Sequence, residues 1–362
     1  MTTSEKNLFL ALCKFKDSDT IMIKETLEHD GDTAAVLGEL FFNRMAGIAY
    51  GVLEKSALLT NVNREFRTSL KCAYTHNIAK NDSYFRCTEW LNEILKPHTG
   101  KYAMLKGAYL CKKYPIGYRI SNDIDLLVKA SNVTKIGEVL SAAGFAQGRI
   151  RNEEFVPATR AEIVSCKMLR GETMPYIKKM NLSHMKYLEV DINFSLDYKS
   201  GDEAVVGTMI DEVEEVNVGG LVLTTLNSQD FFIHLCEHLY KEATAMFWVE
   251  AKRDMSLYKH SDIYMLLSEM RESDLQQLVG RIQTLGCERA CYYAVSSTKS
   301  LFDIDIEIVD RLLAAICPSD AKFMDEVVDP RNGKIYSYIE SDIIKRFWLP
   351  NRTKILTEAG VL

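Results

Sequence analysis

The sequence lacks any apolar run long enough to cross a membrane. Near its start an apolar run extends only from Leu8 to Cys13 before Lys14 ends it. This run is shorter than a secretory signal requires. We therefore expect no membrane association and a cytoplasmic location.

The sequence also lacks an excess of positive charge. Lys and Arg number 44 against 50 Asp and Glu, which gives a net charge of −6. A protein that binds nucleic acid without regard to sequence normally carries a strongly basic face. The balance argues against nucleic acid as a partner, although a local basic pocket for a small phosphorylated ligand remains compatible with it.

Paired cysteines are absent as well. The nine cysteines are an odd number, none lies in a C-x-x-C pair, and most have apolar neighbours. Free, buried thiols in a reducing compartment fit this pattern. With 47% apolar and 26% charged residues, the composition is that of a soluble globular protein.

Three regions follow one another along the chain. Residues 1–98 carry helical spacing, with one long pattern from Thr33 to Leu59 and another from Asn63 to Leu95. The breaker cluster Pro97-His98-Thr99-Gly100 marks a boundary. We assign residues 99–226 to a compact mixed core and residues 227–362 to a second helical region that Asn227 or Ser228 caps.

The mixed core contains short apolar runs separated by turn residues. We expect helices over 108–114 and 132–143, the latter stopped by Gly144. The remaining segments are typical of strands and lie at 102–105, 123–128, 162–169, 184–196 and 221–225.

Asp123 and Asp125 are the central chemical feature of the sequence. In a strand over 123–128 both carboxylates point to one face while Ile124 and Leu126 bury the other. Two such carboxylates can bind a hard divalent cation that also takes phosphate oxygens. A bare pair is not decisive, because 50 acidic residues in 362 give roughly seven acidic-x-acidic triplets by chance.

A second Asp-Ile-Asp copy serves as an internal comparison. Asp303-Ile304-Asp305 leads directly into a helical pattern, so we interpret its acids as cap and first-turn residues.

The surroundings of Asp123 and Asp125 differ from those of the second copy. The segment 101–120 contains five basic residues and no acidic one, and Gly107 follows an apolar run where backbone N–H groups can cradle a phosphate. A third carboxylate is expected from the alternating segment 187–194, in which Glu189, Asp191 and Asn193 share a face.

These residues together resemble the nucleotidyltransferase superfamily with the polymerase-β-like fold, and more narrowly its bacterial branch of uncharacterised nucleotidyltransferases. The motifs that carry the resemblance are Leu105-Lys106-Gly107, Tyr114-Pro115, Arg119, Asp123-Ile124-Asp125, Gly144-Phe145, the acid Asp191, the segment 231–241 and Arg253-Asp254. Where the family has a histidine-tryptophan pair after the third acid, this chain has Asn193-Phe194. The turn is Lys-Gly followed by Ala108, in place of the superfamily's usual Gly-Ser.

The resemblance implies an α+β fold in which a small mixed sheet forms the core between two helical regions. It implies that Asp123, Asp125 and Asp191 hold Mg²⁺ or Mn²⁺ and that Asp191 acts as base. Lys106, Gly107, Arg119 and Ser121 would contact the triphosphate of an NTP. The implied reaction moves a nucleoside monophosphate to a small-molecule or protein acceptor, which fold analogy does not identify.

Two other hypotheses compete with a nucleotidyltransferase. His234-Leu-Cys-Glu-His238 matches H-x-x-E-H, so His234 and His238 share a helix face at zinc-ligand spacing. Alternatively, the polar face of this helix, which continues to Lys241, faces a substrate cleft. To that cleft we assign His238, Lys241 and Glu189. The second hypothesis is a catalytically silent nucleotide-binding or antitoxin-like protein on the same fold.

Overall fold

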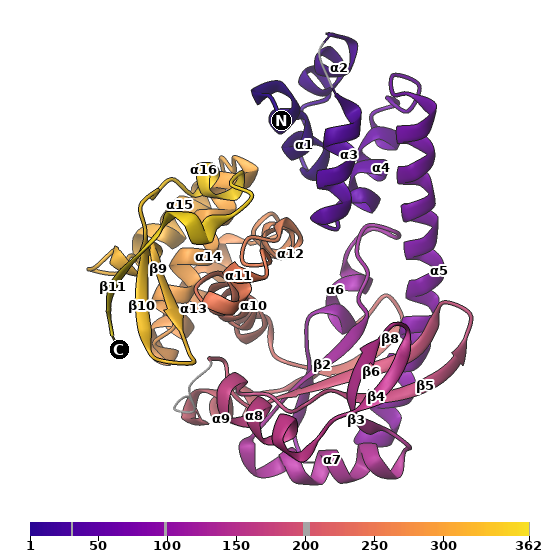
Figure 1. Ribbon diagram of the computed structural model, residues 1–362, viewed down its shortest axis with the longest axis vertical. Coiled ribbons are helices and arrows are strands. Elements are labelled where there is room, and N and C mark those ends of the chain that lie inside the picture. The colour runs from indigo at the N-terminus through magenta and orange to yellow at the C-terminus, as the bar shows by residue number, and fades with distance from the viewer. Residues whose placement is uncertain (30–31, 98–99, 198–202, 362) are drawn as a thin grey trace.

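The computed structural model describes residues 1–29, 32–97, 100–197 and 203–361. Helices and a mixed sheet are both extensive, which confirms the α+β class. Figure 1 shows the N-terminal helices at the top, the sheet at the bottom and the C-terminal region at the left, with the long helix α5 running from the first to the second. The predicted boundary between residues 98 and 99 lies outside the described residues.

Helices form the first region of the chain. They are α1 (Thr3–Cys13), α2 (Thr20–His29), α3 (Thr33–Phe42), α4 (Ala46–Lys55) and α5 (Arg64–Leu95). The prediction of one pattern from Thr33 to Leu59 is wrong in detail, because Arg44 has a positive φ of 59° and separates α3 from α4. The Asn63 side chain caps α5 by accepting a hydrogen bond from the Phe66 N–H.

The central sheet has six strands in the order β1-β2-β6-β5-β3-β4. Only β2 and β6 pair in parallel among the neighbouring strands, so the sheet is mixed. The strands are β1 (Tyr102–Met104), β2 (Asp123–Val128), β3 (Ala146–Arg151), β4 (Glu154–Pro157), β5 (Tyr176–Leu182) and β6 (Met185–Asn193). A separate hairpin pairs β7 (Glu214–Val218) with β8 (Leu221–Thr225).

Five helical elements accompany the sheet. They are α6 (Gly107–Lys113), the 3₁₀ turn η1 (Ala130–Asn132), α7 (Val133–Ala142), α8 (Arg160–Arg170) and α9 (Glu203–Asp211). The strand predicted over 162–169 is wrong. Thr159 and Glu162 form a reciprocal capping box that starts α8, and Gly171, with a φ of 64°, ends it.

The C-terminal region combines helices with a small sheet. Its helical elements are α10 (Ser228–Ala243), α11 (Met246–Glu250), α12 (Leu257–Leu267), α13 (Glu272–Leu285), α14 (Glu288–Phe302), α15 (Glu307–Ala315), η2 (Lys322–Met324), α16 (Ile343–Phe347) and η3 (Arg352–Ile355). Its strands are β9 (Glu326–Asp329), β10 (Lys334–Tyr338) and β11 (Leu356–Val361), paired in the order β11-β10-β9.

This small sheet corrects the prediction that the region is helical to its end. The turn between β9 and β10 contains Asn332-Gly333, and Gly333 has the positive φ of 74° that such a hairpin turn needs. The interpretation of the second Asp-Ile-Asp copy as cap and first-turn residues of the next helix is wrong. Asp303 is the C-cap of α14, whereas Ile306 is the N-cap of α15 and the acids in its first turn are Glu307 and Asp310.

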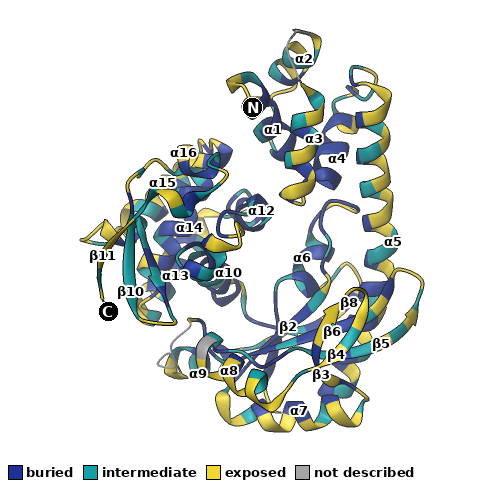
Figure 2. Ribbon diagram, viewed as in Figure 1, coloured by how far each residue is buried: buried dark blue, intermediate teal, exposed yellow. Residues whose placement is uncertain are grey.

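Two large hydrophobic cores hold the molecule together, and a third, small one packs α11 against β9 and β10. One joins the N-terminal helices to the C-terminal helices, and in it the Phe9 ring stacks on Phe347 and meets Trp348 edge-on. The other lies between the sheet, the end of α5 and the buried face of α7. Figure 2 shows β2 almost wholly buried and α6 as a mixture of buried and half-buried residues.

All nine cysteines are free, as expected, and seven are buried. None of the helices formed by the described residues is both long and apolar enough to span a bilayer.

Replacing Gly47 with Ala is expected to destabilise the protein by about 1–3 kcal/mol through overpacking. A Cβ at Gly47 in α4 would lie 2.2 Å from the Gly117 carbonyl oxygen and 2.5 Å from Asn77 Nδ2. The matched control is Gly38→Ala in α3, where a Cβ meets no described atom within 4 Å. That control should gain about 0.5–1 kcal/mol from helix propensity. Urea unfolding of both variants measures the effect, and equal stability of the two would contradict the packing argument.

Candidate functional site

Parallel pairing of β2 with β6 brings the acidic residues together. Asp125 lies opposite Asp191 in the register, and Asp123 lies opposite Glu189. Asp123, Asp125 and Asp191 all line one cavity of about 220 Å³. The structure therefore places the three predicted aspartates on one wall of one cavity, although they are separated by 66–68 residues in sequence between the strands.

Crowding of carboxylates raises their proton affinity. Burial is the largest cause of the raised pKa of Asp125, with Asp123 adding to it and Lys106 opposing it. Burial, then Asp125 and Asp123, raise the pKa of Asp191 well above its usual range. The same causes raise the pKa of Glu189 to about 7. This wall of the cavity therefore favours a bound cation.

The ammonium group of Lys106 places a positive charge beside the aspartates. Its Nζ lies 2.9 Å from Asp125 Oδ1, and although burial opposes the charge, Asp125 raises the pKa of Lys106. The backbone at Lys106 is strained, with a φ of 43° and a ψ of −108° at the start of α6. Strain of this kind persists only where the surrounding structure holds it in place.

Gly107 has a packing role beside the site. A Cβ there would lie 2.4 Å from both Cβ and Oγ of Ser121. The absence of a side chain lets Ser121 approach α6, and Ser121 Oγ donates a hydrogen bond of 2.9 Å to Asp123 Oδ1. Ser121 lines the cavity, whereas Gly107 does not.

Helix α5 fixes the loop that enters β2, a contribution that the sequence analysis missed. Asn77 Nδ2 donates to the Gly117 carbonyl and Asn81 Nδ2 to the Arg119 carbonyl, both at 2.8 Å. Tyr84 Oη donates to the carbonyl of Asp123 at 2.9 Å. The three residues lie at i, i+4 and i+7 on one helix face. In the sequence, the one sign of this contact was that three residues with polar groups recur at helical spacing within an otherwise amphipathic helix.

Arg119 is held inside the protein by an ion pair. Its Nε and Nη2 donate to the two carboxylate oxygens of Asp262 at 3.0 and 3.1 Å, and Nη1 donates to the Ile120 carbonyl. Arg119 lines the cavity. Its engaged guanidinium links the loop before β2 to α12, so its predicted contact with a triphosphate stays a prediction.

The wall opposite the carboxylates was largely missed by the sequence analysis. It comes from segments remote from β2, and the only signal for it was Arg253 in the family resemblance. Its polar, charged and aromatic residues are Arg44, Glu242, Trp248, Arg253, Tyr258, Lys259 and Asp262. Arg170 and Glu172 also line the cavity, but on the side of the carboxylates, since Glu172 bridges to Asn193 at the end of β6. Arg44 and Arg119 lie over the Tyr258 ring, at 4.9 and 5.1 Å from its centroid. The carboxylate wall thus faces a wall in which Arg44, Arg253 and Lys259 stand beside the acids Glu242 and Asp262.

The three residues assigned to a substrate cleft lie in different places. His238 lines the cavity, with Nε2 3.4 Å from Glu242 Oε1, and burial together with nearby lysines lowers its pKa well below the usual range. Lys241 does not line the cavity and donates to the Arg170 carbonyl at 3.0 Å. Glu189 pairs with Asp123 in the strand register but does not line the cavity.

His234 and His238 lie side by side on α10. The His234 and His238 rings stack with centroids 6.4 Å apart, and both His234 nitrogens lack a hydrogen-bond partner among the described residues. The described residues contain no group of three or more His, Cys, Asp or Glu side chains arranged to hold a metal ion. This finding offers no support for a zinc site, and it also means that the aspartates do not form a complete cage.

An incomplete cage still suits Mg²⁺. This ion is usually held by one or two carboxylates together with substrate phosphates, and it prefers hard oxygen donors. Asp123, Asp125 and Asp191 offer only oxygen donors. The residues present therefore fit a metal that arrives with a nucleotide. Asn193, at the position of the family's histidine, points Nδ2 toward Asp125 Oδ1 at 3.5 Å.

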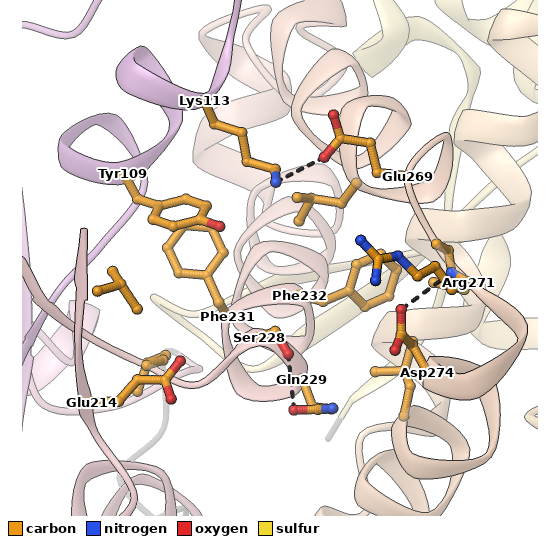
Figure 3. Close-up of a pocket in the computed structure, with 15 residues that line it drawn as sticks. Tyr109, Lys113, Glu214, Ser228, Gln229, Phe231, Phe232, Glu269, Arg271 and Asp274 are labelled. Atoms are coloured by element: carbon orange, nitrogen blue, oxygen red, sulfur yellow. Dashed lines mark hydrogen bonds and ion pairs between the residues drawn. The ribbon is translucent and has the colours of Figure 1, made fainter. Parts of the chain in front are cut away.

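A second, roomier cavity of about 460 Å³ lies against the first turns of α10 (Figure 3). Phe231 and Phe232 form its apolar floor, and Tyr109 lies against Phe231 with ring centroids 4.6 Å apart. The Lys113–Glu269 ion pair, 2.7 Å long, closes one side. This cavity shares no lining residue with the carboxylate cavity and contains no comparable cluster of acids, so we assign the chemistry to the smaller one.

Comparison with known families assigns the chain to one of them. The family described as uncharacterised nucleotidyltransferase matches residues 30–303, which is most of the chain. The chain therefore belongs to the uncharacterised nucleotidyltransferase family, as the resemblance indicated. The match spans every residue that lines the carboxylate cavity. A comparison with curated proteins found no match.

Replacing Glu189 with Gln is expected to stabilise the protein above pH 7. Since the pKa of Glu189 rises from 4.5 to about 7 on folding, the folded protein binds more protons than the unfolded chain between these pH values. The wild-type free energy of unfolding therefore falls as pH rises through this window, by on the order of 2 kcal/mol. In Glu189→Gln the side chain cannot ionise, so the free energy of unfolding does not fall for this reason as the pH rises.

Urea unfolding at pH 5 and at pH 8 measures the difference, with Glu138→Gln on the exposed face of α7 as the matched control. A Glu189→Gln variant whose gain over wild type is the same at both pH values would contradict the assignment.

Proposed function

We propose that this member of the uncharacterised nucleotidyltransferase family transfers a nucleoside monophosphate from an NTP to a small-molecule or protein acceptor. The reaction would depend on Mg²⁺ or Mn²⁺ and release pyrophosphate. The observation that carries the proposal is the parallel β2–β6 pairing, which gathers Asp123, Asp125 and Asp191 on one wall of a polar cavity. A family with this general activity matches the chain over residues 30–303.

The three aspartates would hold the metal. When bound, the metal would neutralise their crowded charge and polarise the phosphate oxygens of the nucleotide. The raised pKa values of Asp125 and Asp191 support a cation at this wall, since each carboxylate is buried beside others.

The chain's own residues would bind and orient the triphosphate. Lys106 lies beside Asp125, and Arg44, Arg253 and Lys259 line the facing wall. These cations suit a polyanion that spans the cavity, and fixed charges of this kind stabilise the charge that develops during phosphoryl transfer. Lys259 forms an ion pair with Glu242, which holds it in position.

The covalent step follows from the proposed reaction. An acceptor oxygen attacks the α-phosphorus while the bond from that phosphorus to the bridging oxygen breaks, and pyrophosphate leaves with the bonding electrons. Asp191, next to Asp125 on the neighbouring strand, would accept the proton of the acceptor hydroxyl at a carboxylate oxygen.

One observation favours a second candidate. The Lys106 ammonium already pairs with Asp125, so one acidic residue is neutralised by the chain itself. A catalytically silent, nucleotide-binding or antitoxin-like protein could use this arrangement without a metal. Dependence on metal separates the two candidates.

Calorimetric binding of ATP, GTP, CTP and UTP, each with and without Mg²⁺, tests the proposal. We expect Mg²⁺-dependent binding of at least one nucleotide, weakened about tenfold or more in Asp123→Asn/Asp125→Asn because the ligands of the metal lose their charge. The matched control is Asp303→Asn/Asp305→Asn, which makes the same change in the structural copy of the motif. Nucleotide binding that is unchanged without Mg²⁺ and unchanged in Asp123→Asn/Asp125→Asn would favour the catalytically silent protein.

Replacing Asp125 alone with Asn is expected to reduce transfer by about 100-fold or more while leaving the fold intact. Transfer is measured with α-labelled NTP in the presence of a cell extract that supplies acceptors, and the fold by circular dichroism. Near-wild-type transfer by this variant would show that the site is assigned wrongly.

A further inference from the structure

Another cavity, of about 370 Å³, adjoins the carboxylate cavity. It lies between β3, helix α8, the end of α11 and the turn after β9, because its lining comes from these segments. Arg170 and Trp248 line both cavities. The two spaces therefore adjoin at these residues, so that a ligand in one would lie next to a ligand in the other.

The order of the strands shows on which side of the aspartates the 370 Å³ cavity lies. Lys106 follows β1, at one end of the order β1-β2-β6-β5-β3-β4, whereas Arg149 lies on β3, near the other end. Asp191 lies on β6 between them. A triphosphate bound at Lys106 and a molecule bound beside Arg149 would thus approach the aspartates from opposite sides.

The lining indicates the chemistry of that molecule. Phe247 and Trp248 supply two rings with centroids 5.5 Å apart, and the buried thiol of Cys166 adds apolar surface. Charge in the lining is mainly positive, from Arg149, Arg170 and Arg331 against one acid, Glu162.

The three arginines differ in how firmly they are held. Arg331 is engaged by Asp329 and Glu250, and Arg170 by Glu172 at 3.0 Å. Arg149 reaches its partner Glu162 only at 3.6 Å, with 46% of its side chain exposed. Arg149 is therefore the guanidinium best placed to take an anionic group, while a cationic ligand would meet three guanidinium groups.

We infer that this space is the acceptor site, and that the acceptor is a small molecule with a flat apolar body and one anionic group. The flat body lies against Trp248 and Phe247, and the anionic group faces Arg149. A volume of about 370 Å³ is within the range of small-molecule pockets. This inference rests on the proposed function, since it presumes an NTP at the neighbouring aspartates.

The test uses anilinonaphthalene sulfonate, a flat aromatic anion whose fluorescence rises on binding. Ser165 lines the space from α8, so Ser165→Trp fills it. The matched control is Met168→Trp on the same helix, where the side chain is 75% exposed and does not line the space. We expect the probe to bind wild type and the control alike, and Ser165→Trp to weaken binding about tenfold or more. Saturating Mg²⁺–NTP should leave probe binding to wild type in place.

Calorimetric NTP binding is measured separately on the same three proteins, and it also reports that each has folded. Unchanged probe binding by Ser165→Trp, or none by wild type, would overturn the inference. Displacement of the probe by NTP, with weaker NTP binding by Ser165→Trp, would assign the space to the nucleobase and also overturn it. A third outcome is that Ser165→Trp loses the probe but wild type binds no NTP. The cavity would then bind a small anion, but the proposed function, and with it the acceptor role, would be wrong. Probe binding thus tests the cavity, and NTP binding tests the proposed function.

Discussion

The parallel register between β2 and β6 is the constraint on which the rest of the site depends. Asp125 faces Asp191 only in this register, because a slip of one residue would turn every side chain of a strand to the opposite face. The buried residues Ile124 and Leu126 hold the other face of β2 in the core. Packing thus determines where the carboxylates lie, and the polar contacts from α5 and Ser121 secure the loop that leads into the strand.

Holding these acids together works against stability. Burial and mutual repulsion raise the pKa of Asp125, Asp191 and Glu189, so each charge is less favourable in the folded protein than in water. Lys106 offsets part of this repulsion, but it does so from a strained backbone. A fold that keeps such a cluster without an evident structural need is typical of a functional site.

Local sequence signals predicted what depends on local physics. Alternation identified β2 and β6, Asn63 and Asn227 marked the starts of α5 and α10, and the family motif led to the aspartates. The errors came from competing local signals, since the capping box at Thr159 outweighed the strand-like composition of α8. The facing wall could not be predicted, because Arg44 and Lys259 meet the aspartates only through tertiary packing.

The shared core of the two helical regions has a consequence for synthesis on the ribosome. The cavity needs Arg44, the aspartates and the segment from Arg253 to Asp262, and the first core joins α1 to residues as late as Phe347. A nascent chain that has exposed only its first two regions already carries Arg44 and Lys106, but it lacks the part of the cavity lining that comes from Arg253 to Asp262. The cavity therefore has its full lining only after the segment up to Asp262 has been synthesised and packed against the sheet.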